Sequence, residues 1–198
     1  MRKIVLATRN KGKILELKEL LATLPLEITG LDIYDGIPAI AETGVTFQEN
    51  AVLKARFTAG FTHELALADD SGLEVEYLNG EPGVYSARYG ESGWDDRRRY
   101  EYLLKKLADV PQDRRNARFR CIVVVYDPWN DLMTTGEGKI EGVILTGPKG
   151  TNGFGYDPVF YIPEKGCTMA ELSEVEKNQI SHRGLAIRSI IPKLKEMF

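Results

Sequence analysis

Two adjacent carboxylates at the end of an apolar segment are the first residues whose types suggest chemistry. Asp69 and Asp70 follow apolar residues 65–68 and precede Ser71-Gly72. We expect residues 65–68 to form a buried strand that ends there, and open α/β sheets bind their ligands beyond the carboxyl ends of strands. Carboxylate oxygens suit Mg²⁺, which usually also contacts substrate phosphates. Because neighbouring strand side chains point to opposite faces, the two aspartates need not share a task. A turn without chemistry is the alternative.

A basic turn before the first predicted helix is a candidate anion site. Residues 3–8 are an apolar run typical of a buried strand, and the following apolar residues, spaced three or four apart, predict a helix that closes at Pro25. Free N–H groups and the helix dipole attract anions at such a turn, although its spacing is not that of a Walker A loop. A solvated basic turn is the alternative. The candidate residues are Thr8, Arg9, Asn10, Lys11, Gly12 and Lys13.

The next predicted helix presents two polar residues on one face. Thr46 and Glu49 have the spacing of a capping box, which marks the start of the helix. Asn50 and Lys54 are four residues apart, so both side chains can reach one ligand. Glu42, on the preceding loop, is a candidate cation ligand, with ordinary solvation as the alternative reading.

An aromatic residue between glycines marks a fourth candidate segment. Residues 147–157 contain four glycines and fit neither a helical nor a strand pattern, so we expect a functional or mobile loop. The glycines allow the backbone to approach a ligand closely, and Phe154 offers a ring on which a base stacks for about 1–3 kcal/mol. A core aromatic residue with a turn is the alternative. The other candidates in this part of the chain are Gly155, Tyr156, Asp157, Lys177, His182 and Arg183.

The composition limits the class of protein. The chain has 198 residues, is 43% hydrophobic and has a formal net charge of -3, so we expect one domain, or two lobes that share a sheet, and no nucleic-acid partner. Its two cysteines belong to no C-x-x-C motif, which argues against a disulfide framework or a structural zinc site. No apolar run reaches the roughly 20 residues that span a bilayer, and we expect no membrane association and a cytoplasmic location.

Strands separated by helices, together with a long hairpin, predict an α/β protein with a mixed sheet. The hairpin joins residues 117–126 to residues 132–145. The other expected strands are residues 3–8, 26–31, 65–68, 73–78 and 159–162, and the expected helices are about 14–24, 46–60, 103–107, 170–177 and 182–197.

Seven short motifs extend over nearly the whole chain. They are Thr8-x-Asn10-x-x-Lys13, Glu42-Thr43-Gly44, Thr46-Phe47-x-Glu49-Asn50-Ala51-x-x-Lys54-Ala55, Ala68-Asp69-Asp70-Ser71-Gly72-Leu73, Gly83-x-Tyr85-Ser86-Ala87-Arg88, Phe154-Gly155-Tyr156-Asp157-Pro158 and Ser181-His182-Arg183-Gly184. Each motif is a modest signal, but in this order and at these separations the combination is specific. It resembles the inosine triphosphate pyrophosphatase family, also described as the non-standard purine nucleoside triphosphate pyrophosphatases.

The resemblance implies a two-lobed α/β fold, with a long, twisted mixed sheet flanked by helices, a central cleft and a homodimer. It implies Asp70 as the general base, and Glu42 and Asp70 as ligands of Mg²⁺, with Asp69 and Asn50 in support. It implies that residues 8–13 and Lys54 hold the triphosphate. The residues that it places around the nucleoside are Ser71, Phe154, Gly155, Tyr156, Asp157, Lys177, His182 and Arg183.

The residues and the resemblance together predict an enzyme that hydrolyses 6-oxo purine nucleoside triphosphates, such as ITP, dITP and XTP, to the monophosphate and pyrophosphate. Donors such as Arg183 or Lys177 facing O6 would reject adenine, because its amino group opposes donor to donor. The alternatives are a pyrophosphatase for another modified nucleotide and a nucleotide-binding module without turnover.

Overall fold

The computed structural model describes residues 2–196, and its chain divides into two compact units. Unit 1 comprises the described residues within 1–70, 121–138 and 182–198, and unit 2 comprises residues 71–120 and 139–181. The sheet has seven strands in the order β2-β1-β3-β4-β5-β6-β7. Strand β1 pairs in parallel with β2 and β3, whereas β6 pairs antiparallel with β5 and β7. The predicted α/β fold with a mixed sheet is confirmed.

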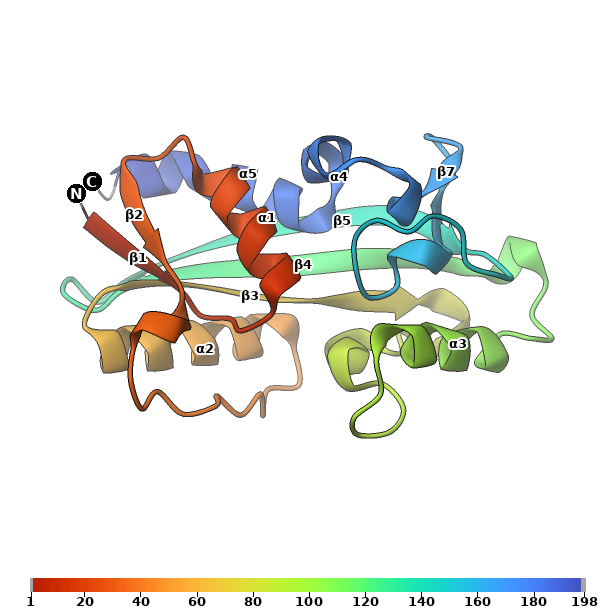
Figure 1. Ribbon diagram of the computed structural model, residues 1–198, viewed down its shortest axis with the longest axis horizontal. Coiled ribbons are helices and arrows are strands. Elements are labelled where there is room, and N and C mark those ends of the chain that lie inside the picture. Colours follow the sequence, from red (N-terminus) through yellow and green to blue (C-terminus); the bar gives the residue numbers. More distant parts are fainter. Residues whose placement is uncertain (1, 197–198) are drawn as a thin grey trace. The chain divides into compact units, whose positions relative to one another are not determined.

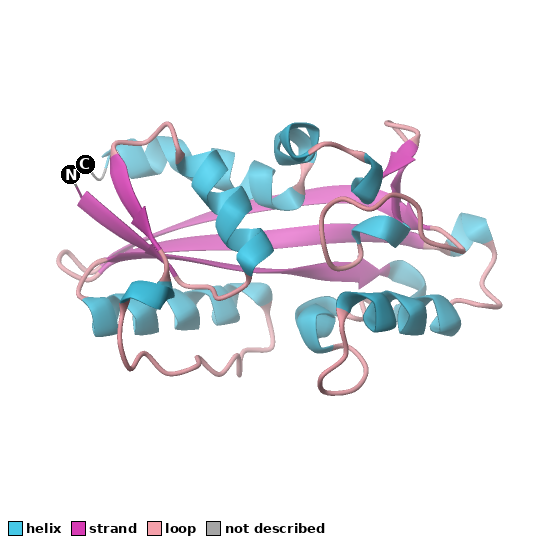
Figure 2. Ribbon diagram, viewed as in Figure 1, coloured by secondary structure: helices cyan, strands magenta, loops and turns pink. Residues whose placement is uncertain are grey.

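The helices and strands are coloured apart in Figure 2. The strands are β1 (Arg2–Leu6), β2 (Leu26–Thr29), β3 (Leu65–Val75), β4 (Asn116–Asp127), β5 (Leu132–Ile144), β6 (Phe160–Ile162) and β7 (Cys167–Thr168). The α-helices are α1 (Lys11–Leu21), α2 (Phe47–Thr62), α3 (Asp96–Lys106), α4 (Glu174–Ile180) and α5 (His182–Glu196).

In unit 1, the alternation of side chains along β1 divides the helices between the two faces of the sheet. Ile4 and Leu6 are fully buried in a core that includes residues of α1 and α5. Val5, which points the other way, packs in a separate cluster with Leu31 and Ile37. Figure 1 shows α1 and α5 on one side of these strands and α2 on the other. The two ends of unit 1's chain therefore build one core.

In unit 2, one apolar core joins strands and helix. Leu103 and Leu107 of the α3 segment are fully buried together with Leu73 and Val75 of β3 and Phe160 of β6. Residues 145–156 contain no helix or strand, in agreement with the loop predicted there.

Strand β3 continues through the segment that we expected to end it. The sequence predicts a break at residues 69–72, but β3 runs without interruption from Leu65 to Val75. The carboxylates of Asp69 and Asp70 contact cations, described below, so their charge does not force the chain into solvent. The strand predicted for residues 76–78 is instead a short 3-10 helix, followed by the expected turn at Asn79 and Gly80, both with positive φ.

One predicted helix start, at Thr46, is confirmed although its capping box is incomplete, and another differs from the structure. The Thr46 side chain accepts from Glu49 N–H as expected, but the Glu49 carboxylate accepts from Val45 N–H, so the capping box is incomplete. The helix expected over residues 170–177 is a 3-10 turn followed by α4, which begins after a complete capping box of Ser173 and Glu176. The sequence contains this second box, and it was missed.

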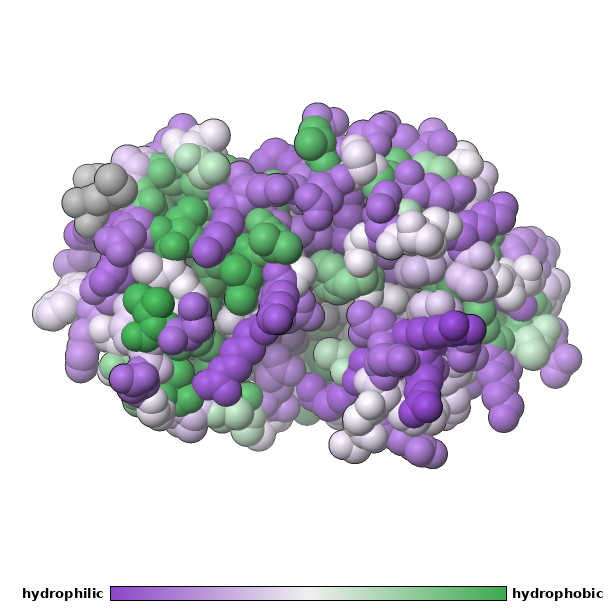
Figure 3. All heavy atoms as spheres, in the orientation of Figure 1, coloured by the Kyte–Doolittle hydropathy of each residue, from purple (hydrophilic) through white to green (hydrophobic). Residues whose placement is uncertain are grey.

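None of the helices within residues 2–196 has the length and apolarity needed to cross a membrane. Hydrophilic side chains dominate the face drawn in Figure 3, and an apolar group lies over α1. Leu15 of that helix is 59% exposed.

Gly138 predicts a measurable stability effect, because it lies against α5 within unit 1. A Cβ atom at this position would lie 2.1 Å from the His182 carbonyl oxygen and 2.5 Å from Ala186 N. We expect Gly138→Ala to lower the free energy of unfolding by at least about 2 kcal/mol in urea titrations, since backbone atoms cannot yield as a side chain does. Gly147→Ala is the control, because its Cβ would meet nothing within 4 Å. Equal stability of the two variants would contradict this packing.

Candidate functional site

Asp69 is a buried anion held between two cations in unit 1. Its side chain is fully buried, and Oδ2 lies 2.9 Å from Lys13 Nζ and 3.2 Å from Arg183 Nε. Arg183 also donates from Nη1 to Glu16 of α1, so its guanidinium joins two carboxylates. Burial alone would raise the pKa of Asp69, but the charges of Lys13 and Arg183 outweigh that effect and hold its pKa well below its usual range. Asp69 is therefore ionised at any physiological pH.

Asp70 points to the opposite face of β3 and meets a different set of partners. Its Oδ1 accepts from Lys54 Nζ at 3.0 Å, and its Oδ2 accepts from Asn50 Nδ2 at 3.2 Å. Lys54 Nζ also lies 2.6 Å from Glu42 Oε1. Asn50 and Lys54 thus act on one group, as their spacing on the helix predicted. Burial raises the pKa of Asp70, Lys54 opposes this, and Glu42 adds to it, so that the net shift is upward.

The contrast between the two aspartates is the main chemical feature of the site. The same strand holds one carboxylate that is a permanent anion and one whose affinity for a proton is raised. Neighbouring carboxylates with pKa values shifted apart are the arrangement by which enzymes separate an acid-base group from a purely electrostatic one. Lys54 stays cationic, because its carboxylate neighbours outweigh burial and raise its pKa.

The turn before α1 is the segment in which the sequence predicts an anion site. Asn10 is the N-cap of α1, and its Oδ1 accepts from Lys13 N–H at 3.2 Å. Asn10 N–H itself donates to Thr8 Oγ1, and Arg9 donates from Nη2 to the Ile37 carbonyl oxygen. Lys11 and Gly12 form the first residues of the helix. The Lys13 ammonium therefore lies on the same helical turn as the backbone N–H groups that attract an anion.

The carboxylates of Glu42 and Asp70 fit a divalent cation of the magnesium type. Both contact the same nitrogen atom, Lys54 Nζ, so the two oxygens are within reach of one cation. Hard oxygen ligands suit Mg²⁺, which commonly takes one or two carboxylates and completes its shell with water and phosphate. Within residues 2–196 no cluster of three or more His, Cys, Asp or Glu side chains could hold a metal by protein ligands alone.

Unit 2 contains a second group of the predicted residues. Lys177 Nζ lies 2.8 Å from Asp157 Oδ2 and 4.5 Å from the centre of the Phe154 ring, and both charged side chains are at least 94% buried. Asp157 Oδ2 also accepts from Phe154 N–H at 2.9 Å. Gly153 has φ 74°, and a Cβ there would lie 2.1 Å from Asp157 Oδ2. The glycine therefore permits the close packing of ring, ammonium and carboxylate.

The remaining predicted residues lie beside these groups in the chain. Gly155 N–H donates to Asp96 at 2.8 Å, and the Tyr156 hydroxyl donates to the Ser86 carbonyl oxygen at 2.8 Å, all within unit 2. Ser71 follows Asp70 in β3, and His182 begins α5, where its side chain is buried.

The Arg183 side chain is 2% exposed, and its Nε and Nη1 contact Asp69 and Glu16. Its expected role beside a base stays a prediction. Glu16 was missed altogether. The available signal was its spacing, because Glu16 is three residues after Lys13 and shares its helix face.

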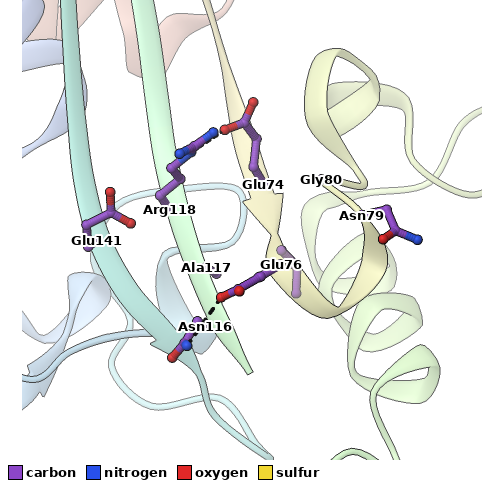
Figure 4. A pocket seen from close by; sticks show the side chains of 9 residues that line it. Glu74, Glu76, Asn79, Gly80, Asn116, Ala117, Arg118 and Glu141 are labelled. Atoms are coloured by element: carbon purple, nitrogen blue, oxygen red, sulfur yellow. Dashed lines mark hydrogen bonds and ion pairs between the residues drawn. The ribbon is translucent and has the colours of Figure 1, made fainter. Parts of the chain in front are cut away.

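A groove in unit 2 is a further cavity of ligand size, but its charge does not suit a polyphosphate. It has a volume of about 570 Å³, and Figure 4 shows the side chains that line it. Glu74, Glu76 and Glu141 outnumber the single cation, Arg118, which donates to Glu74. An anionic ligand would therefore meet net negative charge.

Comparisons with known proteins agree over nearly the full length. A model of the Ham1 family matches residues 4–193. A dITP/XTP pyrophosphatase of Vibrio cholerae is 47% identical over 197 residues, which cover 99% of this chain and 98% of that protein. A dITP/XTP pyrophosphatase of Desulforamulus reducens is 50% identical over 196 residues, covering 99% and 97%. The solved structure of a HAM1 protein from Coxiella burnetii superposes with a TM-score of 0.90 at 43% identity, covering 99% of this chain and all of that one.

The pairing of Asp69 predicts a large loss of stability when its charge is removed. In Asp69→Asn, the buried Arg183 loses one of its two carboxylate contacts described above, and Lys13 loses its contact with the same carboxylate. We therefore expect the free energy of unfolding to fall by about 3 kcal/mol. The measurement is urea unfolding at pH 7. Glu141→Gln is the control, because its carboxylate is 64% exposed and should contribute less than about 1 kcal/mol. Similar losses in both variants would contradict the assigned role of Asp69.

Proposed function

Because the chain belongs to the Ham1 family, we propose that it hydrolyses 6-oxo purine nucleoside triphosphates, such as dITP, ITP and XTP, to the monophosphate and pyrophosphate. It is a nucleoside triphosphate pyrophosphatase by its similarity to the dITP/XTP pyrophosphatases named above. The single observation in the structure that carries the proposal is the pair Asp69 and Asp70, which lie on opposite faces of β3 and contact different cations. Hydrolysis of a phosphoric anhydride needs a group that activates water and positive charges that hold the triphosphate.

In this proposal Asp70 is the general base. Its oxygens each accept from one donor, Lys54 or Asn50, and a carboxylate oxygen has two lone pairs, so each can also accept from a water molecule. A carboxylate that accepts a hydrogen bond from the attacking water can take its proton. The water attacks the α-phosphorus in line, its proton passes to Asp70, and the bond to the bridging oxygen of pyrophosphate breaks. Most of the rate enhancement comes from positioning and charge stabilisation.

The triphosphate is held by groups of unit 1. The N-terminus of α1, Lys13 and Lys54 supply positive charge, and Asp69 fixes the Lys13 ammonium in place at 2.9 Å. Arg183 and Glu16 in turn fix Asp69, which supports a positioning role for Arg183, and its expected contact with the base stays a prediction. Glu42 and Asp70 would hold Mg²⁺, which when bound supplies charge neutralisation at the phosphates.

By its chemistry, the group of Phe154, Asp157 and Lys177 suits a purine base. The Phe154 ring offers a stacking surface, and Lys177, held by Asp157, supplies a donor for O6 of a 6-oxo purine. The Lys177 donor would face the amino group of adenine, which is also a donor, so no hydrogen bond would form. Leaving a buried polar group without a hydrogen bond costs about 1–3 kcal/mol. The roles of Ser71 and His182, the homodimer and the cytoplasmic location implied by the resemblance stay predictions.

The point of attack is testable through the fate of solvent oxygen. We expect ITP to give IMP and pyrophosphate, and in ¹⁸O-labelled water the label to enter IMP, since attack on the α-phosphorus joins the water oxygen to the monophosphate. Mass spectrometry of both products provides the measurement. Label in pyrophosphate would place attack on the β-phosphorus, and IDP with phosphate would exclude the proposed reaction.

Comparing kcat/KM for ITP, XTP, GTP and dTTP tests the alternative of another nucleotide substrate, and absence of turnover with all four would favour a binding module.

The role of Asp70 predicts a loss of turnover. Asp70→Asn keeps the size of the side chain but removes its basicity, so we expect kcat for ITP to fall by about 10²- to 10⁴-fold. Asp113→Asn is the matched control, because Asp113 is exposed in the short helix after α3, and its kcat should stay within twofold of the original. Near-normal kcat in a folded Asp70→Asn protein would remove Asp70 from the mechanism.

A further inference from the structure

Lys54 bridges the two carboxylates that the proposed function assigns to a divalent cation. Its Nζ lies 2.6 Å from Glu42 Oε1 and 3.0 Å from Asp70 Oδ1, and its side chain is 9% exposed. The single positive charge of Lys54 thus partly neutralises the two negative charges of Glu42 and Asp70. A dication that binds these oxygens must compete with that ammonium for the same lone pairs.

The carboxylate pair does not depend on Lys54 alone for its geometry. Asn50, one helical turn earlier, bridges the same two segments: its Nδ2 donates to Asp70 Oδ2 at 3.2 Å and its Oδ1 accepts from Gly44 N–H at 2.8 Å. Gly44 lies against the helix so closely that a Cβ there would be 2.7 Å from Asn50 Oδ1. The loop that carries Glu42 therefore remains attached beside Asp70 when the lysine is replaced.

Lysine is suited to exchange between partners. Its ammonium is a point charge on a flexible four-carbon stem and makes no fixed bidentate contact, whereas arginine would be held in a planar fork. The Arg183 side chain is 2% exposed and its partner Glu16 is 11% exposed, whereas Glu42, a partner of Lys54, is 26% exposed. The contacts of Lys54 are therefore more open to solvent than those of Arg183.

We propose that Lys54 is the exchangeable cation of the Glu42–Asp70 pair: a divalent cation that takes these oxygens releases the ammonium, which then turns to the substrate phosphates. This inference rests on the proposed function for its metal pair. It makes Lys54 a determinant of metal affinity, in addition to a ligand of the triphosphate. No covalent bond changes, and the charge of the pair stays compensated throughout.

The test is the affinity for Mn²⁺ in the absence of nucleotide, measured by the electron paramagnetic resonance signal of free Mn²⁺ at pH 7.5. We expect Lys54→Met to bind Mn²⁺ at least about tenfold more tightly than the original protein, because a competing positive charge is removed from a buried pair. The double variant Glu42→Gln, Lys54→Met should lose this gain, which locates the ion at the pair. Thr58→Val is the control. Thr58 is fully buried one turn further along α2, and its hydroxyl has no hydrogen-bond partner among residues 2–196. The affinity of this variant for Mn²⁺ should equal that of the original protein.

Equal or weaker Mn²⁺ affinity in a folded Lys54→Met protein overturns the inference, as does a gain that persists in the double variant. Circular dichroism and thermal unfolding establish folding, and Lys54→Gln takes the place of Lys54→Met if the latter does not fold. Pyrophosphate release from ITP by the original protein is measured separately. Release without tighter Mn²⁺ binding in the variant rejects the exchange alone, whereas tighter binding without release rejects the proposed function and leaves the exchange standing.

Discussion

Neighbouring side chains of a β-strand point to opposite faces, and in β3 this alternation places two adjacent carboxylates in different electrostatic environments. Asp69 meets Lys13 and Arg183 on the side of α1 and α5, and Asp70 meets Lys54 and Asn50 on the side of α2. A shift of the strand by one residue would exchange the two environments. The different partners of the two carboxylates therefore follow from backbone geometry, and the other described groups of unit 1's site are arranged around them.

Burial makes this arrangement demanding, because an unpaired charge in a protein interior costs several kcal/mol. Each buried charge of the site accordingly has a partner of opposite sign: Arg183 contacts Asp69 and Glu16, Lys54 contacts Asp70 and Glu42, and in unit 2 Lys177 contacts Asp157. Such networks contribute less to stability than to fixing positions. The side chains that would meet a substrate are thus held in place by other side chains of the protein.

Much of the fold and part of the site were predictable from the sequence. The capping-box spacing predicted a helix over residues 46–60, close to the observed α2, and the long hairpin was also predicted. Helical spacing correctly placed Asn50 and Lys54 beside one group. The continuation of β3 through Asp69 and Asp70 was not predictable, because polar residues end a strand only when nothing neutralises them, and their partners come from distant parts of the chain. The same reason hid the contacts of Arg183, whose partner Glu16 is 167 residues earlier. Local patterns predict elements, whereas long-range charge pairing emerges only after folding.

Unit 1 is assembled from three separate stretches of chain, and its last stretch, α5, has consequences for synthesis on the ribosome. Ala186, Ile187 and Ile190 fill the core that Ile4 and Leu6 begin, and Arg183 completes the charge balance of Asp69. That core cannot close until the final helix has emerged from the exit tunnel, whereas every residue of unit 2 has been translated by Ser181. A chain that stops before His182 would expose an incomplete apolar surface and would leave Asp69 without Arg183, so we expect chaperones or proteases to act on it.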